Sequence, residues 1–134
     1  MDSDFGPKYG TPKGVVNEWL EEGKDVILDL DYPGVQQLQA CAKDRIKTIS
    51  ILPPSLKILK ERLVNRKTDS METIERRMSM AEKRVKESTF YDYIVVNDEL
   101  DVAVEEAKSI VLATRVEKKN LSDWNNFVQK ITEN

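Results

Sequence analysis

Short apolar runs alternate with amphipathic stretches along most of this chain. Three runs, at 25–31, 46–52 and 93–96, are rich in β-branched or other apolar side chains and end at turn-forming residues. Runs of this length and composition predict buried strands. Because amphipathic stretches with helical spacing separate them, we predict an α/β protein with a largely parallel sheet flanked by helices.

The amphipathic stretches also carry signals for where helices begin and end. Thr11 followed by Pro12 predicts the start of a first helix, and Gly23 predicts its end. Asp69 with Glu72 three residues later is a capping-box signature for a helix that reaches about residue 86. The expected inward face of that helix comprises Met71, Ile74, Met78, Ala81 and Val85. Further helices are predicted after Gly34, after a Ser55 cap, from 102 to about 116, and at 124–131.

Composition narrows the range of function classes. The 134 residues, 40% of them hydrophobic and 34% charged, suit one compact domain. The absence of His excludes His-based catalysis and His metal ligands, and a single Cys excludes an intrachain disulfide. A net charge of -3 gives no global attraction for nucleic acid or an anionic membrane. With neither a signal-peptide pattern nor a long apolar run, we expect a cytoplasmic protein without nucleic-acid or membrane partners.

Acidic and amide side chains follow two of the predicted strands. Asp29 and Asp31 end the first run, and Asn97 and Asp98 follow the last. In open α/β sheets, ligands bind beyond the carboxyl ends of the strands. Carboxylates there can hold Mg²⁺ beside a nucleotide, or they can simply cap helices and turns at a solvated rim. Both readings are consistent with the pattern alone.

Arginines gather between the second and third predicted strands. Arg62 and Arg66 share one helical face, while Arg76 and Arg77 lie on the next helix. Arginines that converge across a hinge could grip phosphate through paired N–H groups. The alternative is a solvated charged face, paired to neighbouring glutamates.

Five motifs occur in a fixed order: Phe5-Gly6-x-x-Tyr9-Gly10-Thr11, Asp29-x-Asp31-x-x-Gly34, Pro53-Pro54-Ser55, Arg62-Leu63-x-x-Arg66-x-Thr68-Asp69-Ser70 with Arg77, and Tyr91-Asp92-Tyr93-x-Val95-Val96-Asn97-Asp98-x-Leu100-Asp101. In order and spacing, from about residue 5 to residue 111, the chain resembles the guanylate kinases. The resemblance implies a partial P-loop nucleoside-monophosphate kinase fold, with one truncated domain over 1–134. A helical lid would span about 66–87, and a helical tail 117–134.

The resemblance also implies an activity, transfer of the ATP γ-phosphoryl group to GMP, giving GDP and ADP. Mg²⁺ would enter with ATP, and no residue of the chain is assigned as a metal ligand. The GMP side would comprise Tyr9 at the phosphate, Thr11 at the guanine edge, and Asp29 and Asp31. Arg66 and Arg77 would be the catalytic lid arginines that clamp the phosphates, and Asn97 with Asp98 would contact the adenine of ATP.

The chain departs from the family in one large respect. No G-x-x-x-x-G-K-[ST] sequence is present, so the backbone amides that cradle the ATP phosphates are missing. The family's sheet would also lack its central strand, leaving a gap between the strands at 25–31 and 46–52. We therefore expect a chain that is inactive alone, in which those two strands pair directly or a second chain fills the gap as a homodimer or strand swap. The alternative function is a non-catalytic guanylate kinase-like binding module.

Overall fold

The computed structural model describes residues 13–42, 45–117 and 124–133 of the chain. The fold divides into two compact units, residues 1–48 and residues 49–134. Whether the two units together form the single predicted domain stays a prediction. No helix in the described ranges is long and apolar enough to cross a membrane.

The first unit contains two helices, α1 (Lys13–Glu21) and α2 (Tyr32–Ala42). Gly23 ends α1 as predicted, with a positive φ of 82°. Its N–H donates to the carbonyl of Leu20, and the N–H of Lys24 donates to that of Trp19. This is the Schellman arrangement, and it requires a left-handed residue at the position that Gly23 occupies.

The predicted strand at 25–31 is wrong, because the structure has no strand there. Residues 25–31 are assigned to neither a helix nor a strand, and Ile27 is 82% exposed. A strand needs a neighbour to take up its backbone N–H and C=O groups, and apolar composition alone does not supply one. The described sheet therefore contains no direct pairing of this run with the run at 46–52, which was one of the two alternatives for the gap.

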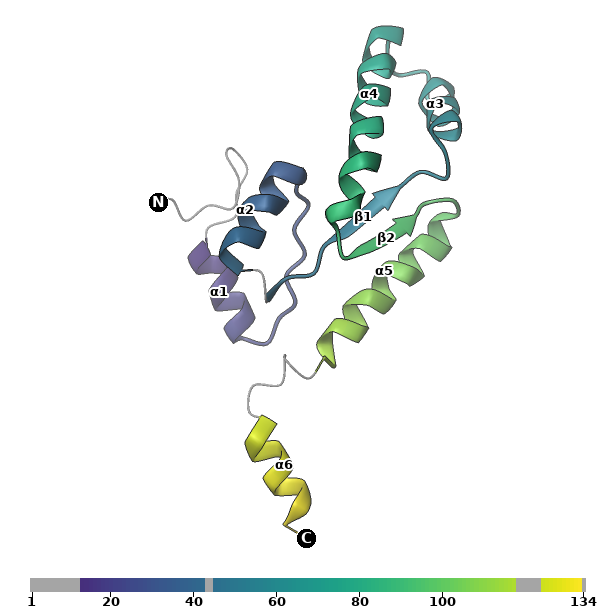
Figure 1. The fold of residues 1–134 in the computed structure, drawn as a ribbon. Helices are drawn as coiled ribbons and strands as arrows, with labels where there is room; N and C mark the ends of the chain where they lie inside the picture. The colour runs from purple at the N-terminus through teal and green to yellow at the C-terminus, as the bar shows by residue number, and fades with distance from the viewer. Residues whose placement is uncertain (1–12, 43–44, 118–123, 134) are drawn as a thin grey trace. The chain divides into compact units, whose positions relative to one another are not determined.

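The second unit is built on a parallel pair of strands, β1 (Ile49–Leu52) and β2 (Tyr93–Val96). Figure 1 shows the two strands side by side. The helices that connect them lie between them in the sequence. The register pairs Ile49 with Tyr93 and Leu52 with Val96. Beyond it, the N–H of Asn97 donates to the carbonyl of Leu52 at 2.7 Å. The fold is therefore α/β as predicted, with β1 shorter than the apolar run from residue 46.

The helices of the second unit follow the predicted pattern closely. Ser55 caps the first of them, its side chain accepting from the N–H of Ile58 at 3.0 Å. The elements are α3 (Leu56–Asn65), α4 (Met71–Glu87), the 3-10 helix η2 (Ser88–Phe90), α5 (Leu100–Arg115) and α6 (Trp124–Thr132). Helices α3 and α4 pack against each other, and α5 packs against β2 (Figure 1).

The core of the second unit is thin. Val95 is its most deeply buried strand residue, and the helices contribute Leu63, Ile74, Ala81 and Ala103. On α4 the predicted inward positions Ile74 and Ala81 are buried and Met78 is half-buried, whereas Met71 and Val85 are exposed. Apolar side chains of both strands also remain exposed: Ile51, Ile94 and Val96.

Candidate functional site

The loop that follows β2 is held by an arginine from α3. Arg62 donates from Nη1 to the carbonyl of Asn97 at 2.9 Å and from Nη2 to the carbonyl of Asp98 at 3.1 Å. The two carbonyls lie 35 and 36 positions away in the chain. The structure thus brings together three residues that the sequence analysis treated as two separate groups, and Arg62 engages backbone rather than a glutamate.

The connection between α3 and α4 has an unusual backbone. Arg66 caps the C-terminus of α3, and Lys67 follows with a φ of 56°, in the left-handed region that residues other than Gly rarely adopt. The N–H of Lys67 donates to the carbonyl of Val64 at 3.1 Å. This tight turn reverses the chain at the start of the predicted lid.

An ion pair lies across that turn. Arg77, in the second turn of α4, donates from Nη1 to Oδ2 of Asp69 at 3.0 Å. The Asp69 side chain is 17% exposed and that of Arg77 46%, so the guanidinium reaches solvent on its other side. The bond fixes Arg77 by one nitrogen and leaves the remaining N–H groups open to an anion.

The capping-box prediction at Asp69 is wrong by one position. Ser70 is the N-cap of α4, because its side chain accepts from the N–H of Thr73 at 3.2 Å. Asp69 instead holds Arg77. Asp and Ser are both favourable N-cap residues, and here Ser70 caps the helix while Asp69 pairs with Arg77.

The two acids of the first unit differ in what they do. Asp31 is the N-cap of α2: its Oδ1 accepts from the N–H of Gly34 at 3.1 Å, and its carbonyl accepts from the N–H of Val35. A Cβ at position 34 would lie 3.2 Å from that carboxylate oxygen, a tight contact that Gly avoids. Asp29 is exposed. The capping interpretation of the sequence therefore holds for Asp31.

The remaining predicted GMP-side residues, Tyr9 and Thr11, lie outside the described residues. Asp29 and Asp31 belong to the first unit, and Arg62, Arg66, Arg77, Asn97 and Asp98 to the second. Within the described ranges no cluster of three or more carboxylate or thiol side chains is placed to hold a metal ion.

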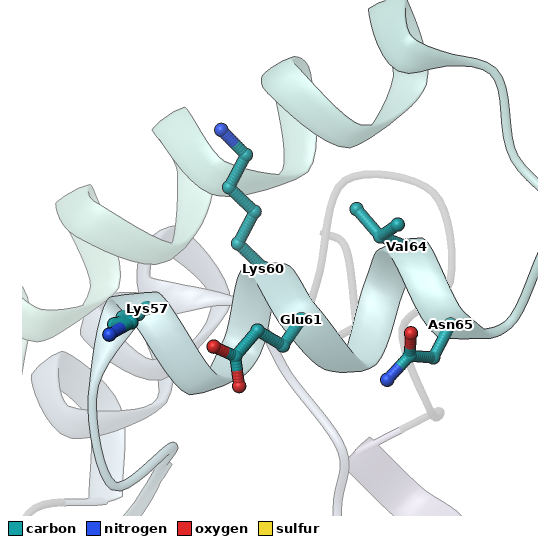
Figure 2. Close-up of a pocket in the computed structure, with 5 residues that line it drawn as sticks. All are labelled: Lys57, Lys60, Glu61, Val64 and Asn65. Atoms are coloured by element: carbon teal, nitrogen blue, oxygen red, sulfur yellow. The ribbon is translucent and has the colours of Figure 1, made fainter.

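A shallow hollow lies on the face of α3 opposite Arg62. Figure 2 shows the side chains that line it, all from this one helix: Lys57, Lys60, Glu61, Val64 and Asn65. None of the predicted site residues lines it, and a single helix face offers few converging groups to a ligand. The candidate site is therefore the edge formed by the β2 loop and the α3–α4 turn.

Comparison with known proteins agrees with this arrangement. A family model described as guanylate kinase matches residues 3–114. The chain belongs to the guanylate kinase family. A guanylate kinase of Zymomonas mobilis is 38% identical over 128 residues, and one of Hydrogenovibrio crunogenus is 48% identical over 111 residues. A solved guanylate kinase structure from Anaplasma phagocytophilum superposes with a TM-score of 0.74 at 18% identity, which supports the fold.

The match to guanylate kinases is partial on their side. It covers 95% of this chain but 59% of the Zymomonas protein, and 83% of this chain but 54% of the Hydrogenovibrio protein. Against the Anaplasma structure the shares are 90% and 57%. The chain thus spans somewhat more than half the length of the guanylate kinases that it matches.

Sequence reasoning missed two functional features of this guanylate kinase-family chain. It placed Arg62 among phosphate-gripping or surface-paired arginines, whereas Arg62 holds the β2 loop. It also gave Asp69 only a capping role. Asp69 lies before the N-cap Ser70, outside the helix that carries Arg77, so helical spacing gave no signal for their pairing.

The cap at Asp31 gives a test of its structural role. We expect Asp31→Ala to lower the free energy of unfolding by about 1 kcal/mol, because the N–H of Gly34 in the first turn of α2 loses its side-chain acceptor. Asp31→Asn keeps the acceptor and should stay within a few tenths of a kcal/mol of the parent. Urea denaturation followed by circular dichroism measures both. Equal losses in the two variants would contradict the capping role.

Proposed function

We propose that this chain carries part of a guanylate kinase site, which transfers the γ-phosphoryl group of ATP to GMP. A phosphate oxygen of GMP would attack the γ-phosphorus as the bond to ADP breaks, giving GDP and ADP. The observation that most supports the proposal is the α3–α4 turn, where Arg77 is held by Asp69 with much of its guanidinium exposed. In the first unit, Tyr9, Thr11, Asp29 and Asp31 would form the GMP side.

The lid arginines would stabilise charge on the transferring group. Phosphoryl transfer spreads negative charge over three equatorial oxygens, and arginine N–H groups fit phosphate bidentately. Arg66 and Arg77 flank the turn at Lys67, one at the end of α3 and one inside α4. A change at that turn would move Arg77 relative to Arg66, so closing over a nucleotide would bring both onto its phosphates and exclude water.

Asp69 would orient Arg77 for that contact. Its carboxylate takes one terminal nitrogen of the guanidinium, at 3.0 Å. The other terminal nitrogen and Nε can still donate to a phosphate. The ion pair already restricts the orientation of the Arg77 side chain before a phosphate binds. Less side-chain entropy is then lost on binding, which lowers its entropic cost.

The adenine side would be the loop after β2, where Asn97 is half-buried and Asp98 exposed. Mg²⁺ would come with ATP and supply positive charge at its phosphates. The described carboxylates form no cluster for a resident ion, and Asp31 is occupied as a helix cap. The proposal assigns no residue of this chain as a metal ligand.

We further propose that a second copy of the chain docks on β1. Alternate residues of a strand direct their backbone groups to the same side. Because the carbonyl of Leu52 accepts from Asn97, the backbone groups of Ser50 and Leu52 point to β2. The backbone groups of Ile49 and Ile51 therefore point to the opposite edge of β1. No other described strand pairs with that edge. Ile51 is 62% exposed beside it. An open apolar edge of this kind favours pairing with another strand.

Nucleotide binding tests the lid assignment. We expect isothermal titration of the chain with MgATP to detect binding, and Arg77→Gln and Arg66→Gln each to weaken it by about tenfold, the loss of roughly 1.4 kcal/mol of charge-assisted hydrogen bonding. Arg84→Gln, an exposed arginine near the end of α4, is the matched control and should bind as the parent does. Absence of MgATP binding, or an equal loss in the Arg84 variant, would count against the assignment.

The strand edge predicts an oligomeric state. Sedimentation should find a dimer of the chain, and Ile51→Lys should shift it to monomer, because a charged side chain on an edge strand opposes pairing. Val104→Lys removes an equally apolar, 53% exposed side chain from α5 and should leave the dimer intact. A parent chain that sediments as a monomer at high concentration contradicts the proposed docking.

A further inference from the structure

Arg62 contacts main-chain carbonyls through both of its terminal nitrogens. Both donate to main-chain carbonyls, those of Asn97 and Asp98, in successive residues of one loop. A guanidinium is planar and presents its N–H groups in a rigid fork. Two bonds from one fork to two neighbouring carbonyls fix both the distance and the orientation of the loop relative to α3.

Few other bonds fix this loop. The N–H of Asn97 donates to Leu52 at 2.7 Å, which continues the strand ladder by one residue. The N–H of Asp98 donates only locally, to the carbonyl of Val96 at 3.0 Å. Among the described main-chain hydrogen bonds of Asp98, the one from Arg62 ties this residue to an element outside the loop.

Arg62 also lies close in the chain to the lid turn. It stands one helical turn before Arg66, and its carbonyl accepts from the N–H of Arg66 at 3.3 Å. The fork thus joins the β2 loop to the last turn of α3, directly before the left-handed residue Lys67. A displacement of that end of α3 would be passed to the loop.

We propose that Arg62 is a positioning residue, which holds the Asn97–Asp98 loop in the arrangement that receives the nucleotide base. This inference rests on the proposed function, because that function assigns the loop to adenine. One N–H of each terminal nitrogen is bonded to a carbonyl, so the Arg62 guanidinium is held against the loop by two bonds, whereas Asp69 holds Arg77 by one. Arg62 thereby differs from Arg77, and the difference can be measured.

The first experiment measures the loop without any ligand. Amide hydrogen exchange is compared in the parent, Arg62→Lys and Lys60→Gln, a control on the exposed face of the same helix. Lysine keeps the charge but cannot bridge two carbonyls. We expect exchange at the Asn97 and Asp98 amides to rise by about tenfold or more in the Arg62 variant, the equivalent of one lost charge-assisted bond.

The exchange experiment carries its own folding control. Val95 is 2% exposed in the centre of the β1–β2 pair, and its amide should exchange at the parent rate in all three proteins. Unchanged exchange at Asn97 and Asp98, with Val95 protected, would overturn the inference. An equal rise in Lys60→Gln would overturn it as well, because that variant leaves the fork in place.

The second experiment distinguishes contacts to the nucleotide base from contacts to the phosphates. MgATP and inorganic triphosphate are titrated into the parent, Arg62→Lys and Arg77→Gln. We expect Arg62→Lys to weaken MgATP by about tenfold and leave triphosphate unchanged, whereas Arg77→Gln weakens both. Equal weakening of both ligands by Arg62→Lys would overturn the positioning role. Failure of the parent to bind either ligand would overturn the proposed function and the adenine assignment. If amide exchange in the loop still rises in Arg62→Lys, the two bonds from Arg62 would nevertheless be shown to hold the loop.

Discussion

The parallel ladder between β1 and β2 is the interaction on which the rest of the second unit depends. It sets the register that ends both strands at one edge, with Leu52 opposite Val96. From that edge β1 leads through a Ser55 cap into α3, and β2 leads into the loop at Asn97. Because the strands are parallel, their carboxyl ends lie together, and Arg62 can span the short gap between α3 and the loop.

The same ladder explains why so much apolar surface stays open. Two strands bury one central residue well, Val95, but Ile51, Ile94 and Val96 keep 44% or more of their surface exposed. In a wider sheet these side chains would be covered by helices and by neighbouring strands. The family relatives are longer, since this chain spans 59% of the Zymomonas guanylate kinase and 54% of the Hydrogenovibrio one. The exposed edge is where additional chain would add most to burial.

Local signals in the sequence were sufficient for much of this structure. Gly23, Ser55 and the helical periodicities act within a few residues, and the elements they predict are present. The strand at 25–31 failed because strand formation needs a distant partner that local composition does not specify. Arg62 was undetectable as a loop anchor for the same reason: its acceptors are backbone carbonyls 35 and 36 positions away. The sequence indicated the candidate site by its side chains, whereas the bonds that hold its loop involve main-chain carbonyls.

We propose that this chain carries lid and base-side elements of a phosphoryl-transfer site, and its sequence contains no G-x-x-x-x-G-K-[ST] motif to cradle phosphates. The most direct measurement is GMP-dependent formation of ADP from MgATP by the purified 134-residue chain, with a guanylate kinase of full family length as the positive control. The account predicts a rate indistinguishable from that of the mixture without protein. Formation of GDP and ADP in equal amounts, at a rate proportional to the concentration of the chain, would contradict it.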